Sequence, residues 1–295
     1  LRSLGSAFHV AMNGASAGRK IISLLNVPDP VWGKNEVKGT ELKLNGVTFS
    51  YDGKRDVLKN VSMTFPEKGM TAIVGESGCG KSTVVNMLVG AYRPKAGNVT
   101  VGGEVLENVT RESYYSHLAS VSYNTYIFND TVRANFELAK KNATDEEIWA
   151  ALEAVNLADF IKENGGLDKV ITEDANNVSG GQKQRLALAV NLVADKDIYV
   201  FDEATSNIDI ESEAIIMDNI KAMSREKSVI VISHRLANVV PADNIYYMEE
   251  GEVKECGSHA QLMSAQGGYA KLFNTQKALE EGYKEITGAT AEVSV

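Results

Sequence analysis

The stretch from Gly75 to Thr83 combines glycines, a lysine and hydroxyl groups, which are the residue types that bind phosphate. Its members are Gly75, Glu76, Ser77, Gly78, Cys79, Gly80, Lys81, Ser82 and Thr83. Glycines let consecutive backbone N–H groups turn inward on a phosphate, and the positive end of a following helix points at the same place. Lys81 would contact the β- and γ-phosphates, and the Ser82 hydroxyl would bind Mg²⁺. This full Walker A pattern predicts binding of a nucleoside triphosphate.

Two adjacent acids, Asp202 and Glu203, follow the apolar run 198–201. The C-terminal ends of parallel strands point into the ligand crevice of an α/β sheet. There Asp202 would hold Mg²⁺, directly or through water, and Glu203 would polarise the attacking water as a general base. Standing alone, such a pair is usually a solvated turn. With the phosphate-binding pattern upstream, it instead predicts hydrolysis of the triphosphate, the Walker B arrangement.

A third segment, between these two, begins a helix with small and polar residues. Its members are Ser179, Gly180, Gly181 and Gln182. Ser179 as N-cap and Gln182 three residues later form a capping box for a helix over 183–194. A helix start with two glycines also binds anions through its free N–H groups. Taken alone, the segment is either a helix cap only or an anion site.

The elements that must position these residues are indicated by hydrophobic periodicity. Alternation over 41–49, a turn at Asp52-Gly53 and the run 57–65 predict an antiparallel pair. Short apolar runs predict buried strands at 70–74, 198–201, 229–232 and 245–248. A capping box at 144–147 precedes helical spacing, so a helical insert is predicted over about 111–190. The fold class is therefore α/β: a P-loop NTPase core with a mainly parallel sheet, an N-terminal antiparallel β subdomain and an α-helical insert.

Composition limits the classes of function. Lys plus Arg total 30 and Asp plus Glu total 39, a net charge of −9. A net acidic chain without a dense basic run is a poor candidate for coating nucleic acid, so no nucleic-acid partner is expected. Its two cysteines, Cys79 and Cys256, form neither a disulfide framework nor a metal cluster, which predicts a reducing, cytosolic setting. No window approaches the roughly 20 apolar residues of a membrane span.

The chain divides into three predicted regions: 1–37, 38–279 and 280–295. Residues 1–25 predict a helix that is either an amphipathic surface helix or the cytosolic extension of a last membrane helix, and Pro28 and Pro30 begin a linker over about 26–38. The central region is the nucleotide-binding domain, and the last is predicted to be a flexible tail. Because the sequence opens at Leu1 rather than at a methionine, we expect a fragment of a larger product.

In combination these motifs resemble the ATP-binding cassette (ABC) ATPase family, over nearly all of residues 40–275. Tyr51 stands where the family places an aromatic ring that stacks on adenine. Residues 206–209 resemble the D-loop that crosses to a partner subunit, and 178–182 the family signature. His234 resembles the switch histidine that contacts the γ-phosphate and completes catalysis with Glu203. The resemblance implies an ATPase with ATP and Mg²⁺ as cofactors.

The resemblance also implies a head-to-tail dimer of cassettes, homo- or heterodimeric, that sandwiches two ATP molecules. Ser179 and Gly181 would then contact the ATP held by the partner's Walker A loop. Several stretches are similar to the exporter branch: Glu173, residues 128–135, and the opening residues 1–5 with 8–9. Export powered by ATP, a transmembrane domain as partner and a place at the cytoplasmic face of the cell membrane follow as expectations. A weaker resemblance is to heterodimeric thiol exporters linked to cytochrome bd assembly.

One departure concerns Tyr123, which occupies the place of the family's Q-loop glutamine, a residue that normally completes the Mg²⁺ shell. Asn124 would take this role if the register slips by one. Ala175 also stands where a glycine is common. These changes predict an altered rate of hydrolysis and leave the pair Glu203 and His234 intact.

Rival classes are distinguished by spacing and length. ABC ATPases of DNA repair carry long coiled coils between Walker A and signature, whereas 96 residues separate Lys81 from Val178. Soluble translation factors of the family hold two cassettes and basic segments. Two alternatives remain open: an importer cassette, and a degenerate regulatory cassette of a heterodimeric transporter that binds ATP without splitting it. The choice of the transported substrate is expected to lie with membrane helices rather than with this domain.

Overall fold

The computed structural model describes residues 2–26, 32–123, 126–172 and 175–291. Its first strands form a small antiparallel sheet. For residues 2–4 and 280–291 the description is limited to the backbone. The strand order is β2-β1-β4-β5. Its members are β1 (Leu42–Phe49), β2 (Leu58–Phe65), β4 (Ala96–Val101) and β5 (Glu104–Val105). Leu42, Leu44 and Val47 of β1 are buried, so one face of this sheet packs inward. The predicted antiparallel β subdomain is confirmed.

A larger, mainly parallel sheet follows the order β10-β9-β3-β8-β7-β6. Its members are β3 (Gly69–Gly75), β6 (Leu118–Ser122), β7 (Ile198–Asp202), β8 (Ser228–Ile232), β9 (Asn244–Glu249) and β10 (Glu252–Gly257). Only the edge pair β9 and β10 is antiparallel; the remaining pairs are parallel. Parallel strands buried on both faces read as continuous apolar runs, and β8 is buried at every position.

Alternate residues of the parallel strands enter two different hydrophobic clusters. Ile73 and Val200 pack with the antiparallel sheet and with α2 (Lys81–Leu88). Ala72 and Tyr199 point to the other face, where helices cover the sheet. Successive side chains of a strand point to opposite faces of the sheet. One of these faces packs on α2, which follows the phosphate loop and lies in the core between the sheets. Also on that side lie η1 (Leu106–Asn108) and α3 (Arg111–His117).

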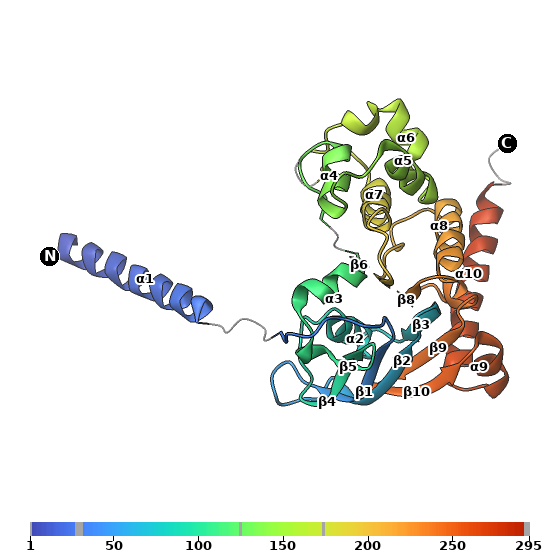
Figure 1. The fold of residues 1–295 in the computed structure, drawn as a ribbon, viewed down its shortest axis with the longest axis horizontal. Helices are drawn as coiled ribbons and strands as arrows, with labels where there is room; N and C mark the ends of the chain where they lie inside the picture. Colours follow the sequence, from blue (N-terminus) through green and yellow to red (C-terminus); the bar gives the residue numbers. More distant parts are fainter. Residues whose placement is uncertain (1, 27–31, 124–125, 173–174, 292–295) are drawn as a thin grey trace.

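The helical part of the chain lies between β6 and β7 in sequence and stands above the sheets in Figure 1. Its elements are α4 (Val132–Ala139), α5 (Asp145–Ala154), α6 (Ala158–Glu163), η2 (Gly166–Asp168) and α7 (Gly180–Leu192). The predicted capping box at Thr144 and Glu147 is present. The predicted bounds of the insert, 111–190, are too wide at the start, because β6 within them pairs with β7 in the main sheet.

Four further elements pack on the same face of the main sheet as the helical insert. They are α8 (Ile210–Met223), η4 (Leu236–Val239), α9 (His259–Ala265) and α10 (Gly268–Ala291). In Figure 1, α10 runs beside α8 and ends near the C-terminus. The sequence predicted a tail from residue 280 onward, whereas the backbone is helical as far as Ala291. The flexibility of this end stays a prediction.

At the other end of the chain, α1 (Arg2–Leu25) projects away from the body of the fold (Figure 1). Its apolar side chains, among them Phe8, Val10 and Leu24, are exposed. No helix within the described residues is long and apolar enough to cross a membrane. Both interpretations of this helix, surface helix or membrane-helix extension, stay predictions. Most of the predicted linker, including Pro28 and Pro30, lies outside the described residues.

Candidate nucleotide-binding and catalytic site

The phosphate loop joins the end of β3 to the start of α2. Gly75 has φ +150°, and a Cβ there would lie 2.2 Å from the backbone oxygen of Met248 on β9. Gly80, the N-cap of α2, has φ +110° in the left-handed region that glycine tolerates. These two glycines therefore let the loop turn tightly against β9 and aim backbone N–H groups at one point.

Lys81 lies at the floor of the loop and is only 5% exposed. Its ammonium donates hydrogen bonds to the backbone oxygens of Gly75 at 2.8 Å and Glu76 at 2.9 Å. A cavity of about 280 Å³ opens beside it. The predicted residues that line this cavity are Ser77, Gly78, Gly80, Lys81, Ser82, Thr83, Glu203 and His234. Cys79, in contrast, is buried in the core.

Glu203 and His234 form a hydrogen-bonded pair at the wall of this cavity. Nε2 of His234 lies 2.6 Å from Oε1 of Glu203. An ionised carboxylate can only accept, so the imidazole donates from Nε2. The backbone of Glu203 has φ +54°, an uncommon conformation for a side chain with a Cβ, and its N–H donates to the oxygen of Ile232 at 2.9 Å. The end of β8 thus helps to fix the turn that presents this carboxylate.

Asp202, the last residue of β7, provides a buried anionic oxygen. Its Oδ1 has no hydrogen-bond partner among the described residues. Burial and the neighbouring Glu203 carboxylate raise the pKa of Asp202, against the opposing charges of Lys81 and His234. A buried carboxylate oxygen without a donor, near the charges of Lys81 and His234, fits the oxygen ligands that Mg²⁺ prefers.

Tyr51 lies on the loop after β1, outside the residues that line the cavity. Its hydroxyl lies 3.0 Å from Oγ1 of Thr83, which ties the ring to the start of α2. Phe49 and Tyr92 meet the ring edge-on, at 4.9 and 5.3 Å between centroids. The ring is 55% exposed, so it offers a surface on which a base could stack.

Ser179, Gly180, Gly181 and Gln182 lie at the start of α7 and do not line the cavity. The predicted capping box of Ser179 and Gln182 is present. The helix begins at Gly180 and ends at Leu192, slightly earlier than the predicted 183–194. Gly181 packs against the loop after β7, because a Cβ there would lie 2.9 Å from the oxygen of Asn207. These residues are therefore brought close to the D-loop rather than to Lys81.

Tyr123 follows the end of β6, where Ser122 pairs with Asp202. It therefore lies at the edge of the sheet that carries the carboxylate pair. Its side chain is 53% exposed. Asn124, the alternative ligand predicted from the sequence, and Glu173 both lie outside the described residues.

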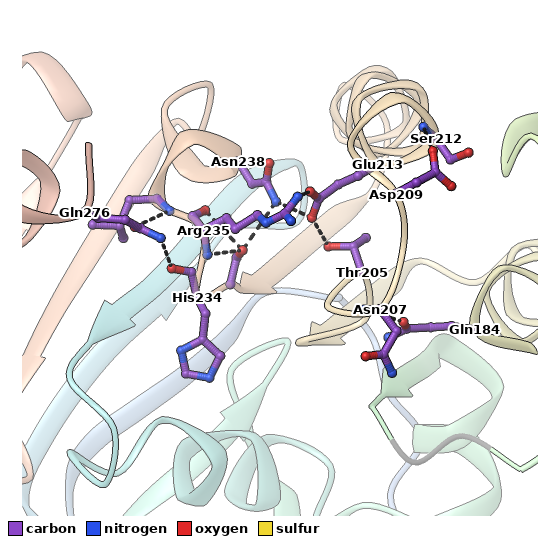
Figure 2. A network of polar contacts seen from close by, with 12 residues as sticks. Gln184, Thr205, Asn207, Asp209, Ser212, Glu213, His234, Arg235, Asn238 and Gln276 are labelled. Atoms are coloured by element: carbon purple, nitrogen blue, oxygen red, sulfur yellow. Dashed lines mark hydrogen bonds and ion pairs between the residues drawn. The ribbon is translucent and has the colours of Figure 1, made fainter. Parts of the chain in front are cut away.

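Several residues around the site were not singled out by the sequence. Gln184, buried on α7, donates to the backbone oxygen of Glu203 at 3.2 Å and accepts from the N–H of Asn207 at 3.0 Å. Glu213 of α8 accepts from Thr205 in the loop after β7, and Gln276 of α10 donates to the backbone oxygen of His234 in the loop after β8 (Figure 2). An acid in the first turn of a helix reads as an ordinary helix stabiliser, and a lone glutamine carries no motif. No sequence signal marked them.

A second cavity of about 110 Å³ shares Glu203 and His234 with the first. Its other lining residues are polar: Thr205, Ser206, Glu213, Ser233 and Arg235. Water fits a polar cavity of this size. The pair Glu203 and His234 therefore has access to solvent-sized space on the side of α8 as well as to the phosphate cavity.

Comparison with known proteins adds family information to this geometry. A family model described as ABC transporter matches residues 58–206, which include the phosphate loop and the carboxylate pair. An uncharacterized ABC transporter ATP-binding protein of Haemophilus influenzae is 43% identical over 98% of this chain, and the match covers 52% of that protein. An ATP-dependent lipid A-core flippase of Aliivibrio fischeri is 37% identical, over 94% of this chain and 48% of the flippase.

Among solved structures, a bacterial Atm1-family ABC exporter with ATP bound matches with a TM-score of 0.81 and 30% sequence identity. The match covers 92% of this chain and 49% of that exporter chain. The chain thus spans about half the length of the relatives that it matches.

Proposed function

This chain belongs to the ABC transporter family, as one of its ATP-binding domains, and we propose that it hydrolyses ATP to drive export across a membrane. The observation that carries the proposal is one cavity that holds Lys81, Ser82, Glu203 and His234 together. A phosphate-binding ammonium, a hydroxyl and a carboxylate–imidazole pair are the groups that splitting of a γ-phosphate requires.

Binding would begin with a movement of Lys81. Its ammonium now contacts two backbone oxygens, and a triphosphate in the cavity would replace them with phosphate oxygens. Ser82 and Asp202 would hold Mg²⁺, with Tyr123 at the sheet edge beside them; the ion would offset the phosphate charge. Thr83 would hold Tyr51 in place for adenine. The loop glycines would leave the backbone N–H groups free for the phosphates.

Hydrolysis would use Glu203 as the base. The carboxylate would take a proton from the attacking water, whose oxygen bonds to the γ-phosphorus as the bond to the β-phosphate oxygen breaks. His234 would orient this carboxylate through its 2.6 Å hydrogen bond and present its ring to the γ-phosphate. The proton would then leave Glu203 for solvent.

A second cassette would complete the site. Ser179, Gly180, Gly181 and Gln182 do not line the cavity beside Lys81, and they stand at the positive end of a helix, so they suit an ATP molecule held by a partner. We propose a head-to-tail dimer, homo- or heterodimeric, coupled to a transmembrane domain at the cytoplasmic face of the cell membrane. The relatives that span twice the length of this chain, among them an ATP-dependent flippase, support such a partner. We propose no specific substrate from the weaker resemblance to thiol exporters.

The regions predicted from the sequence are retained as a proposal for the domain limits: residues 1–37, the nucleotide-binding domain 38–279, and 280–295. β10 belongs to the main sheet, and α9 and α10 pack on that sheet, which supports including them in the nucleotide-binding domain.

The test is Glu203→Gln, which keeps the shape of the side chain and removes the base. Turnover of MgATP should fall by about 10²–10⁴, while ATP binding survives. The exposed Glu249→Gln on β9 is the matched control and should behave as the unaltered chain. Phosphate release and calorimetric ATP binding measure the two properties. Unchanged turnover in Glu203→Gln would show that another group acts as the base.

A further inference from the structure

The loop that carries His234 is held by a side chain from the far end of the chain. Gln276, on α10, donates from Nε2 to the backbone oxygen of His234 at 2.8 Å. Its Oε1 accepts from the backbone N–H of Leu236 at 2.9 Å. One amide therefore binds both ends of a three-residue segment that lies about 40 residues earlier in sequence.

The imidazole itself depends on this backbone for its position. Its side chain is 55% exposed, and it bonds Glu203 through one ring nitrogen. Figure 2 shows the ring pointing away from the polar network, while the backbone of His234 faces Gln276. Because few neighbours enclose the ring, a shift of the backbone would carry the imidazole with it.

The other side of the same loop is fixed by Glu213 of α8. Its carboxylate accepts hydrogen bonds from Thr205 at 2.7 Å and from Asn238 at 2.8 Å, and it pairs with Arg235. Thr205 follows the carboxylate pair in sequence, and Arg235 follows His234. The loop after β8 is thus fastened to α8 on one side and to α10 on the other (Figure 2).

We propose that Gln276 is a positioning residue for His234, through which α10 sets the rate of ATP hydrolysis. The amide supplies both the donor for the His234 oxygen and the acceptor for the Leu236 N–H, whereas a carboxylate can only accept. Loss of either bond frees the segment that carries the imidazole and so lengthens its contact with Glu203. The proposal rests on the proposed function, because it requires that His234 acts in hydrolysis.

The experiment compares Gln276→Leu and Gln276→Glu with Asn274→Leu in the full chain. Asn274 carries an exposed amide on the same helix, so its substitution is the matched control. Two modest hydrogen bonds are at stake, so Gln276→Leu should lower kcat about 3- to 10-fold. KM for ATP should stay within about twofold, because within the described part of the chain the hydrogen bonds of Gln276 reach Leu236 and, among the residues that line the phosphate cavity, only His234. Gln276→Glu keeps the acceptor and loses the donor, so it should also lower kcat.

A double-mutant cycle separates positioning from general support of the fold. With His234→Ala already in place, Gln276→Leu should change kcat by less than about 1.5-fold, since no imidazole remains to be positioned. An equal loss of kcat in both backgrounds would show a purely structural role and overturn the proposal. A kcat equal to that of the unaltered chain in Gln276→Glu would also overturn the proposal. This second variant tests the proposal even if Gln276→Leu folds poorly.

Failure of the proposed function gives a different result. If His234→Ala and Glu203→Gln turned over ATP as fast as the unaltered chain, the site assignment and this inference would fall together. If both lost turnover while Gln276→Leu kept it, the inference alone would be wrong.

Discussion

Glu213→Gln should destabilise the fold strongly, because this carboxylate is a buried acceptor surrounded by donors. The residue is 4% exposed, and its oxygens receive the Thr205 hydroxyl, the Asn238 amide and the Arg235 guanidinium. Glutamine has one acceptor oxygen and one NH₂ group. Whichever way the new amide turns, its NH₂ faces a donor.

The magnitude follows from these contacts. Breaking a fully buried ion pair by removing one partner costs about 3–5 kcal/mol. The Arg235 side chain is 40% exposed and keeps part of its hydration, so the cost here should lie near or below the lower end of that range. Hydrogen bonds to a charged group contribute about 1.5–3 kcal/mol each, and at least one is lost. We expect a loss of about 2–4 kcal/mol in the free energy of unfolding.

Urea unfolding at pH 7, followed by circular dichroism and extrapolated linearly, measures this loss. Asp218→Asn is the matched control: it removes an exposed charge on the same helix and should change the free energy by less than about 0.5 kcal/mol. A Glu213→Gln variant that unfolds within about 0.5 kcal/mol of the unaltered chain would refute the reasoning. The carboxylate would then not be the centre that joins the D-loop to the loop of His234.

Two further outcomes are expected. Tyr123→Gln should raise MgATP turnover about threefold or more and steepen its dependence on Mg²⁺, because it adds an oxygen ligand at the sheet edge beside Asp202; steady-state kinetics across Mg²⁺ concentrations check this, and an unchanged rate would contradict it. Asp243→Asn should lower the free energy of unfolding at pH 7 by less than about 1 kcal/mol, because solvent screens a side chain that is 59% exposed, and the difference should shrink as the pH falls below 3.8. Partial burial opposes its ionisation, but the Met70 N–H and the Lys221 ammonium prevail and hold the pKa of Asp243 below its ordinary value of 3.8. Its stabilising effect is therefore complete above that value and is lost as the pH falls through the lower folded value; urea midpoints measured from pH 3 to 7 test the sign.

The parts of the site that are contiguous in sequence were predictable, since their geometry is local. Glycines before a lysine and a serine define the loop at Gly80, and the capping box of Ser179 depends on four neighbouring residues. The pairing of Glu203 with His234 came only through the family resemblance. No pattern of spacing states that residues 31 positions apart meet at 2.6 Å.

What escaped prediction depends on tertiary contact. β6 lies inside the stretch predicted to be a helical insert, and a five-residue strand next to a helix has little periodicity to reveal it. Gln276 illustrates the same limit more sharply. Its amide is one of many surface amides until the fold places α10 against the loop after β8. Packing, not composition, assigns its role.

The division of the interior into two hydrophobic clusters has a consequence for how the molecule can unfold locally. The parallel sheet separates the two clusters: one face packs against the antiparallel sheet and α2, and the other packs against α4–α8 with α9 and α10. A disturbance of the apolar packing in the helical layer, such as an enlarging substitution, reaches the phosphate loop only through the sheet. The phosphate loop is rooted on the opposite side. We therefore expect the helical layer to unfold locally as its own cooperative unit while the phosphate loop stays folded.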